Sequence, residues 1–191
     1  MTSIYIEEKT YDKANFTENP LAIGEYERCV FKNCDFSNTK LSEIKFIECE
    51  FLTCNLSLAK LQKTTFRDVR FKECKMLGLL FFTCNAFGLT VSFDSCNLNH
   101  SSFYQRKIKQ IAFINCRLND IDFTDCDLTA AIFDQCDLMN AKFENTIIEK
   151  ADFRTSFNFS IDPMINKIRK AKFSSTNILG LLNAFDIEIE E

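Results

Sequence analysis

Glycine, proline and histidine are scarce in this sequence, and tryptophan is absent. The 191 residues include 4 Gly, 2 Pro and one His. A phosphate-binding loop needs clustered glycines and a nucleophile elbow needs a Gly-x-Ser-x-Gly turn, and the sequence has neither. His100 shares an outward-facing column with Asp120, a pairing more typical of a surface hydrogen bond than of a general base. We therefore predict a protein that is not an enzyme and has no catalytic residues and no cofactor.

Long apolar runs are also missing. No run approaches the roughly 18 residues of a membrane-spanning helix. The opening MTSIYIEEKTYD does not have the charged-then-apolar pattern of a signal segment. These absences predict a cytoplasmic protein with no membrane partner, in which the ten cysteines stay reduced. The length and the 46% content of hydrophobic residues suit a single continuous core.

Phenylalanine is over-used, with 21 copies, and large apolar residues recur at every fifth position. The series starts at Phe16, slips by two residues between Ala86 and Phe93, and resumes to Phe153. It comprises 28 repeats, or 30 if two earlier members belong to it, Ile6 and Tyr11. A period of five fits neither the 3.6 residues of a helical turn nor the two-residue alternation of a strand. It indicates a coil that turns a corner every five residues.

Four such repeats close one turn of the predicted coil. Residues 20 positions apart then stack at the strand spacing of about 4.8 Å, and each coil pairs with the next as in a β-solenoid. If the slip is placed in an outward bulge, one column consists of phenylalanine alone: Phe31, Phe51, Phe71, Phe93, Phe113, Phe133 and Phe153. We predict that this ladder forms the core of a solenoid spanning residues 1–157.

All ten cysteines occupy one kind of position, two residues before a member of the five-residue series. Elsewhere the position holds mostly Ala, Ser, Thr, Val or Ile, which indicates an inward slot for a small, non-polar group. The spacing of Cys29 with Cys34, and of Cys49 with Cys54, also suits a zinc site. However, consecutive repeats face different sides of the coil, and stacked thiols form a line rather than a tetrahedron. We predict no metal site.

Two stretches break the pattern. The slip surrounds Phe87-Gly88-Leu89, and Arg106 falls in a small inward slot. Either the corner near residues 104–111 is distorted, or Arg106 turns outward through a bulge. Phe82 and Phe87 lie off the inward frame; they are either exposed apolar contacts or packed under the bulge, and packing is the simpler interpretation.

The five-residue pattern resembles the pentapeptide-repeat family, whose usual repeat is A(D/N)LXX. The stretches CDLTA, CDLMN and CNLNH carry this repeat almost letter for letter, and the resemblance covers residues 11–157. It implies an all-β fold, a right-handed quadrilateral β-helix.

Residues 158–191 leave the repeat and are expected to form a C-terminal cap with a helix and a short strand. Helical spacing, after Ser174 or Ser175 as N-cap, relates Ile178, Leu181, Leu182 and Phe185. The strand is suggested by the alternation of Ile187 and Ile189 with Glu188 and Glu190. The Asp162-Pro163 pair, LLNAF and IEI resemble the C-terminal segment of the Qnr quinolone-resistance proteins, which joins two chains. The resemblance implies a homodimer with those four apolar residues at its interface, while a cap on a monomer is the alternative.

Charge is distributed unevenly along the chain. Residues 61–110 hold 8 Lys and Arg against 3 Asp and Glu, whereas residues 111–161 hold 4 against 9. No continuous basic stripe is present, which argues against direct binding of nucleic acid. Ion pairs between adjacent coils are expected for Lys107 with Asp127, Arg117 with Asp137, Asp122 with Lys142, and Asp134 with Arg154. The acids without such a partner are the candidate partner-binding residues: Asp120, Asp125, Glu144 and Glu149.

The resemblance to the Qnr and MfpA proteins implies a function. It suggests a protein that binds a type II topoisomerase, DNA gyrase or topoisomerase IV, as a DNA mimic and modulates fluoroquinolone sensitivity. The sequence lacks the two sizeable loops of the Qnr proteins, which puts quinolone protection in doubt and leaves an MfpA-like mode open. The alternative is a structural or adaptor module that presents flat β faces to another protein and has no link to topoisomerases. A metal-binding protein is a weaker third possibility.

Overall fold

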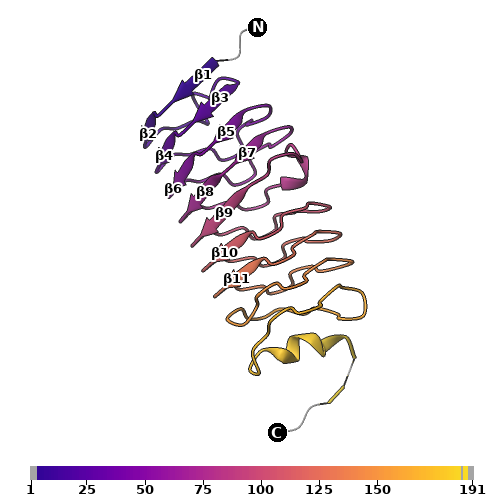
Figure 1. The fold of residues 1–191 in the computed structure, drawn as a ribbon. Helices are drawn as coiled ribbons and strands as arrows, with labels where there is room; N and C mark the ends of the chain where they lie inside the picture. Colours follow the sequence, from indigo (N-terminus) through magenta and orange to yellow (C-terminus); the bar gives the residue numbers. More distant parts are fainter. Residues whose placement is uncertain (1–3, 186, 189–191) are drawn as a thin grey trace.

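The chain forms a rod of stacked coils (Figure 1). The computed structural model describes residues 4–185 and 187–188. Its strands form two parallel sheets. Sheet A contains β1 (Ile4–Glu7), β3 (Gly24–Glu27), β5 (Lys45–Ile47) and β7 (Thr65–Arg67). Sheet B contains β2 (Thr10–Asp12), β4 (Val30–Lys32), β6 (Glu50–Leu52), β8 (Val69–Lys72), β9 (Val91–Asp94), β10 (Ala112–Ile114) and β11 (Ile132–Asp134).

Strand pairing confirms the predicted repeat of 20 residues per coil. Phe31 pairs with Phe51, and across the slip Phe71 pairs with Phe93. The two extra residues therefore bulge outward and leave the register of sheet B intact. The repeat also begins before Phe16, because the earlier members pair with the next coil: Ile6 with Tyr26 and Tyr11 with Phe31. The right hand of the coil stays a prediction.

Each coil has four sides, which we number in chain order. Side 1 is sheet B, and side 4 is sheet A with its continuation beyond the bulge. Sides 2 and 3 are joined by isolated bridges, such as Asn55 with Lys75 on side 2 and Asp122 with Lys142 on side 3. The bulge ends sheet A after β7, whereas sheet B continues to β11.

The phenylalanine ladder forms the core, as predicted. All seven members are at most 1% exposed. Phe31 and Phe51 stack with ring centroids 4.7 Å apart, and Phe71 and Phe93 with centroids 5.4 Å apart, so the stack is continuous across the slip. Such a column buries apolar area in every coil at about 25 cal/mol per Å², with a further gain from ring stacking. Tyr11 and Phe173 extend it at the two ends, against Phe31 and Phe153.

Left-handed backbone turns make the corners. Residues with positive φ recur every five positions, among them Asn38 (58°) and Asp120 (55°). A non-glycine residue in this region costs about 1 kcal/mol or more, and Asn and Asp tolerate it best. Bonds between coils offset the cost: the Asn38 N–H, for example, donates to Ser57 O at 2.9 Å. A chain with few glycines can therefore contain many corners.

The C-terminal segment differs from the expected single helix. It forms two short 3₁₀ helices, η2 (Ile178–Leu181) and η3 (Asn183–Phe185). The reason is contact with the last coil: the Ile161 N–H donates to Gly180 O at 2.9 Å, and a Cβ on Gly180 would lie 2.5 Å from Phe159 O. Ile187 and Glu188 form no strand, and Ile189 and Glu190 lie outside the described residues.

Bonding between coils continues beyond residue 157. Ile147 pairs with Lys167, and Asp152 pairs with Lys172. The division of the chain at residue 157 stays a prediction. None of the helices in the described part of the chain is long and apolar enough to cross a membrane.

Candidate partner-binding face

Three of the four candidate acids surround side 3. This side contains the repeats centred on Leu41, Leu61, Phe81, Phe103, Phe123 and Phe143. Asp120 occupies the corner where side 2 ends, Asp125 occupies the corner where side 3 ends, and Glu144 lies on side 3 itself. The backbones of Asp125 and Glu144 are directly bonded, with Asp125 N donating to Glu144 O at 2.9 Å. Glu149 lies apart, on side 4.

The acids have more neighbours than the sequence suggested. An Asp120 carboxylate oxygen lies 3.6 Å from His100 Nδ1, and the other accepts from Asn140 Nδ2 at 3.2 Å. Lys142 Nζ lies 3.3 Å from Glu144 Oε1, so Glu144 has a cationic neighbour within its own repeat, although the prediction considered only partners in the adjacent coils. Asp125 is exposed at its corner and makes a long contact with Gln105 Nε2, at 3.5 Å. All three acids remain at least partly exposed and available to a partner.

The predicted stacking is confirmed for Lys107 with Asp127, Arg117 with Asp137, and Asp122 with Lys142, but the side chains of these pairs, and those of Asp134 and Arg154, do not form ion pairs. Among the described residues, Asp127 pairs instead with Lys109 at 3.2 Å, and Asp152 with Arg154 at 2.7 Å. The reason is local. An aspartate that directly precedes the central residue of a repeat can accept, through its side chain, a hydrogen bond from the backbone N–H two residues later. Asp122 accepts in this way from Thr124 N at 2.9 Å. This bond turns the Asp122 carboxylate toward the corner, whereas Asp137 and Asp134 also accept from the next coil, from Asn158 Nδ2 at 2.9 Å and from Thr155 Oγ1 at 2.7 Å.

An apolar patch adjoins the acids on side 3. It consists of Leu80, Phe82 and Tyr104, which are 42%, 36% and 37% exposed. The rings of Phe82 and Tyr104 meet edge to face, with centroids 6.3 Å apart and planes at 89°. Gln105 Nε2 joins the patch to the acids, because it donates to Tyr104 Oη at 3.0 Å and lies against Asp125. The sequence signal for this patch is two large apolar residues at outward positions, on either side of an inward phenylalanine.

Arg106 enters a distorted corner beneath this patch. The 3₁₀ helix η1 (Phe81–Thr83) replaces the left-handed turn that Lys63 (φ 58°) and Gln105 (φ 57°) make in the neighbouring coils. The Arg106 guanidinium donates to Phe82 O, and also to Cys84 O at 3.1 Å. The corner at Arg106 itself is regular, since Gln105 has a φ of 57° and its N–H donates to Thr124 O at 3.0 Å, so the distortion that the sequence placed in the repeat of Arg106 lies one coil earlier, in η1.

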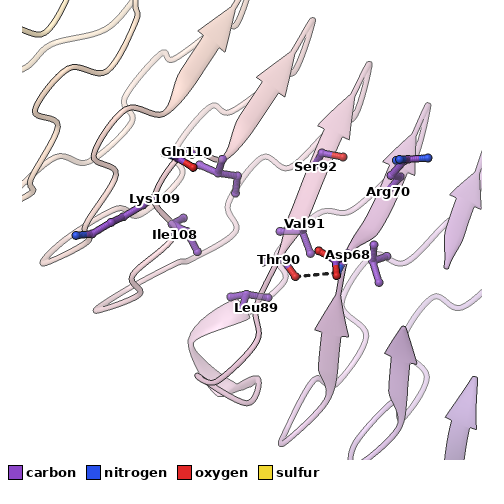
Figure 2. A pocket seen from close by; sticks show the side chains of 11 residues that line it. Asp68, Arg70, Leu89, Thr90, Val91, Ser92, Ile108, Lys109 and Gln110 are labelled. Atoms are coloured by element: carbon purple, nitrogen blue, oxygen red, sulfur yellow. Dashed lines mark hydrogen bonds between the residues drawn. The ribbon is translucent and has the colours of Figure 1, made fainter. Parts of the chain in front are cut away.

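The bulge at residues 86–90 opens a cleft beside it (Figure 2). The cleft measures about 350 Å³ and lies between the bulge and the next coil, where Ile108–Ile111 forms one wall. Thr90 fastens the bulge by accepting at Oγ1 from the Asp68 N–H at 2.8 Å. Leu89 is buried, but Phe87 is 96% exposed, so the interpretation that Phe87 packs under the bulge is wrong.

The cysteine slot has a polar function that the sequence did not indicate. Eight of the ten thiols donate to a carbonyl of the preceding coil, as Cys126 Sγ does to Phe103 O at 2.8 Å. Thr146 Oγ1 makes the equivalent bond to Phe123 O at 2.9 Å. The slot therefore favours a small donor as well as a small volume. All ten cysteines are free and buried, and burial raises the pKa of the Cys49 and Cys126 thiols to about 12. Within the described ranges, no group of three or more His, Cys, Asp or Glu side chains is arranged to hold a metal ion.

The C-terminal end of the rod exposes a second apolar surface. Met164, Leu179 and Phe185 are 78%, 50% and 45% exposed, and Ile178 is 43% exposed. Leu181 is instead buried against the core. Of the four residues predicted at a dimer interface, Ile178 and Phe185 are thus exposed, Leu182 is half-buried, and Leu181 closes the end of the core.

A stack of parallel four-sided coils around an aromatic core defines a β-solenoid. The sequence matches the family described as pentapeptide repeat region over residues 25–88 and 86–156. The chain therefore belongs to the pentapeptide-repeat family.

Solved structures share this fold. Two trypsin-treated variants of QnrB1, described as a plasmid-mediated fluoroquinolone resistance protein, superpose with TM-scores of 0.64 and 0.61. Both are 16% identical to this chain; the first match covers 98% of each chain and the second covers 100% of each. Full-length QnrB1 is 17% identical, with a TM-score of 0.53 over 96% of this chain and 100% of its own. No curated protein matches the chain by sequence.

Proposed function

We propose that this protein acts in the cytoplasm by binding a type II topoisomerase, DNA gyrase or topoisomerase IV, and modulates its sensitivity to fluoroquinolones. The binding surface is the acidic part of side 3, with Asp120, Asp125 and Glu144, and Glu149 extends it onto side 4. The observation that carries the proposal is the position of Asp120, Asp125 and Glu144 around one side of a rod of stacked coils. The shared fold of QnrB1, a fluoroquinolone resistance protein, supports the choice of partner.

The mechanism follows from electrostatics. A protein site that holds duplex DNA is lined by Lys and Arg, because phosphate contacts supply most of the non-specific affinity. Carboxylates fixed on a β-solenoid offer such a site a preorganised row of negative charge, which speeds encounter and fixes orientation. The protein binds and does not catalyse, and its effect on the drug comes from occupying or reshaping the DNA site.

A supercoiling assay tests the proposal. Purified gyrase is assayed with and without a fluoroquinolone, in the presence of the wild type or of Asp120→Lys/Asp125→Lys/Glu144→Lys. We expect the wild type at micromolar concentration to change supercoiling or its inhibition by the drug, and the triple variant to lose this effect. Glu48→Lys/Asp68→Lys/Glu73→Lys is the matched control, because these acids are exposed, left-handed corner residues, as Asp120 and Asp125 are. If the wild type has no effect on either topoisomerase, the adaptor alternative is favoured.

We also infer that two chains associate end to end through the C-terminal segment. The apolar residues exposed there, Ile178, Leu179 and Phe185 with Met164, support a buried contact. Light scattering should give the mass of two chains for the wild type. Leu179→Asp should give that of one chain, because a charge would be buried without a partner. Phe87→Asp, at an exposed aromatic far from this end in the sequence, is the control that should stay dimeric.

A further inference from the structure

The coil that contains Phe81 departs from its neighbours at one corner. In the coil before, the Glu43 N–H donates to Gln62 O, and in the coil after, the Gln105 N–H donates to Thr124 O. The equivalent bond would join Lys63 N to Phe82 O, but η1 shifts it to Thr83 O. The bulge removes a second bond. It affects the column of small inward residues that contains Thr64, Cys84 and Cys126. The carbonyl of Thr64 accepts from Asn85 N in the next coil, and that of Cys126 accepts from Ile147 N. Cys84 O has no such backbone donor in the described part of the chain.

Arg106 satisfies both carbonyls. Its guanidinium donates to Phe82 O and Cys84 O, from a slot that holds Cys84 in the coil before and Cys126 in the coil after. Its Nε is buried and has no hydrogen-bond partner. Placing a cation in this position is expensive compared with a thiol, because the guanidinium loses part of its hydration. Despite this cost, Arg106 holds the backbone conformation of η1, which no other coil in the described ranges adopts.

That conformation presents the aromatic pair to solvent. Along side 3 the outward positions are polar in the coils on either side, with Lys60 and Gln62 before and Asp122 and Thr124 after. In the two coils between them, three of the four outward positions are apolar, at Leu80, Phe82 and Tyr104, and the fourth is Ser102. Phe82 is held at its carbonyl by Arg106, and its ring lies edge to face against Tyr104. Rigid, partly exposed aromatic residues of this kind are typical of binding hot spots.

We propose that Phe82 and Tyr104, with Leu80, are the apolar anchor of the topoisomerase contact, and that Arg106 is a positioning residue that holds the anchor in place. This inference rests on the proposed function and adds a specific requirement on the partner surface. That surface must combine an apolar pocket for the two rings with basic groups on the side that faces Asp120, Asp122 and Asp125. A surface that binds DNA by its charge alone would lack the pocket.

Equilibrium binding to the reconstituted gyrase and topoisomerase IV holoenzymes tests the anchor. The variant is Phe82→Gln/Tyr104→Thr, which places on side 3 the residue types found one coil away, at Gln62 and Thr124, and should therefore fold. We expect it to bind at least about tenfold more weakly than the wild type. Phe87→Ala is the matched control: its ring is 96% exposed on the bulge, and its removal should leave affinity unchanged.

Ionic strength separates the anchor from the acids. The loss of affinity caused by Asp120→Lys/Asp125→Lys/Glu144→Lys should shrink as the salt concentration rises, because salt screens the attraction between the wild-type acids and the partner. The loss caused by Phe82→Gln/Tyr104→Thr should persist. If the wild type binds neither holoenzyme, the proposed function and the anchor are both overturned. If it binds and the aromatic variant binds equally well, the anchor alone is overturned.

A double-mutant cycle tests the role of Arg106. Arg106→Thr places in the slot the residue type of Thr64 and Thr146, which lie in the same column. We expect Arg106→Thr to weaken binding, and to add little further loss in combination with Phe82→Gln, because both act through one side chain. Arg106→Lys should restore part of the affinity, since it can donate to one carbonyl at a time. Reduced thermal stability with unchanged affinity would overturn the positioning role.

Discussion

Gly180 lies against Phe159 so closely that no side chain fits between them. A Cβ on Gly180 would lie 2.5 Å from the Phe159 carbonyl oxygen and equally close to its ring, while Gly180 O accepts from the Ile161 N–H. This contact docks the C-terminal segment on the last coil, where Leu181 covers the end of the core. A solenoid needs such a cover, because its last coil otherwise leaves backbone groups and core side chains in water.

Gly180→Ala should therefore destabilise the protein, although alanine favours helical conformations. We expect a loss of about 1–3 kcal/mol in the free energy of unfolding, since the methyl group forces the segment away from backbone that cannot move. Urea unfolding followed by circular dichroism measures it. Ser175→Ala, at an exposed position of the same segment, is the control. Equal stability of the two variants would contradict the close contact.

Phe113 occupies the middle of the aromatic ladder, stacked between Phe93 and Phe133 at centroid distances of 5.2 Å on both sides. Phe113→Ala should cost about 3–5 kcal/mol, through lost burial and a cavity that the stacked coils cannot close. Phe113→Leu, which retains most of the volume, should cost much less. Ile114→Ala, one residue away and 37% exposed, should change stability by no more than about 0.5 kcal/mol. A small effect of Phe113→Ala would show that the ladder contributes little.

The ten thiols should be unreactive in the native protein. They are buried, and burial raises the pKa of Cys49, Cys84 and Cys126 to about 12, so the reactive thiolate is rare at pH 8. Labelling with a disulfide reagent at pH 8 should modify almost no thiol under native conditions. It should modify all ten after denaturation in guanidinium. Rapid native labelling of several thiols would mean that the coils open readily.

Asp152 should make stability depend on pH. The hydrogen-bonded guanidinium of Arg154 lowers the pKa of Asp152 below its ordinary value, and Lys172 Nζ lies 3.8 Å from the same carboxylate. Because the folded pKa is lower than the unfolded one, the unfolded chain takes up the proton first as pH falls. The contribution is complete at neutral pH and is lost below the usual aspartate pKa of about 3.9.

Asp152→Asn should accordingly be less stable than the wild type at pH 7, and the difference should shrink as pH falls below about 4. The effect is modest, since the Arg154 side chain is 61% exposed. Urea midpoints measured from pH 7 to pH 2 test this. Glu48→Gln, which removes an exposed corner acid with no ion pair in the described ranges, should not show such a convergence. A constant difference at all pH values would rule out the charge as the cause.

The main features of the fold could be predicted because the five-residue period is strict. Large apolar residues at that interval define which side chains turn inward, and the columns of Phe31 and Phe51 follow from a repeat of 20. The slip could be located because only one placement kept phenylalanine above phenylalanine. The cysteine slot was predicted by size, whereas its hydrogen bond to the preceding coil depends on where that carbonyl lies.

The candidate surface was only partly predictable. Sequence spacing placed Asp122 and Lys142 one above the other, yet Asp122 bonds to the Thr124 N–H and Lys142 to Glu144, because local backbone donors and side-chain rotamers compete with the next coil. Arg106 stood out as an anomaly, but its partners lie in another coil, on carbonyls that a 3₁₀ turn and a bulge leave without backbone donors.

The sequence by itself determined the path of the chain, because large apolar residues at every fifth position are all buried only if the same side chains turn inward in every coil. Tertiary structure decided what the rod presents to its surroundings. The exposed Phe82 and Tyr104, the acids around side 3 and the docked C-terminal segment all depend on contacts between residues about 20 positions apart, and the geometry of such contacts is fixed only when the coils stack.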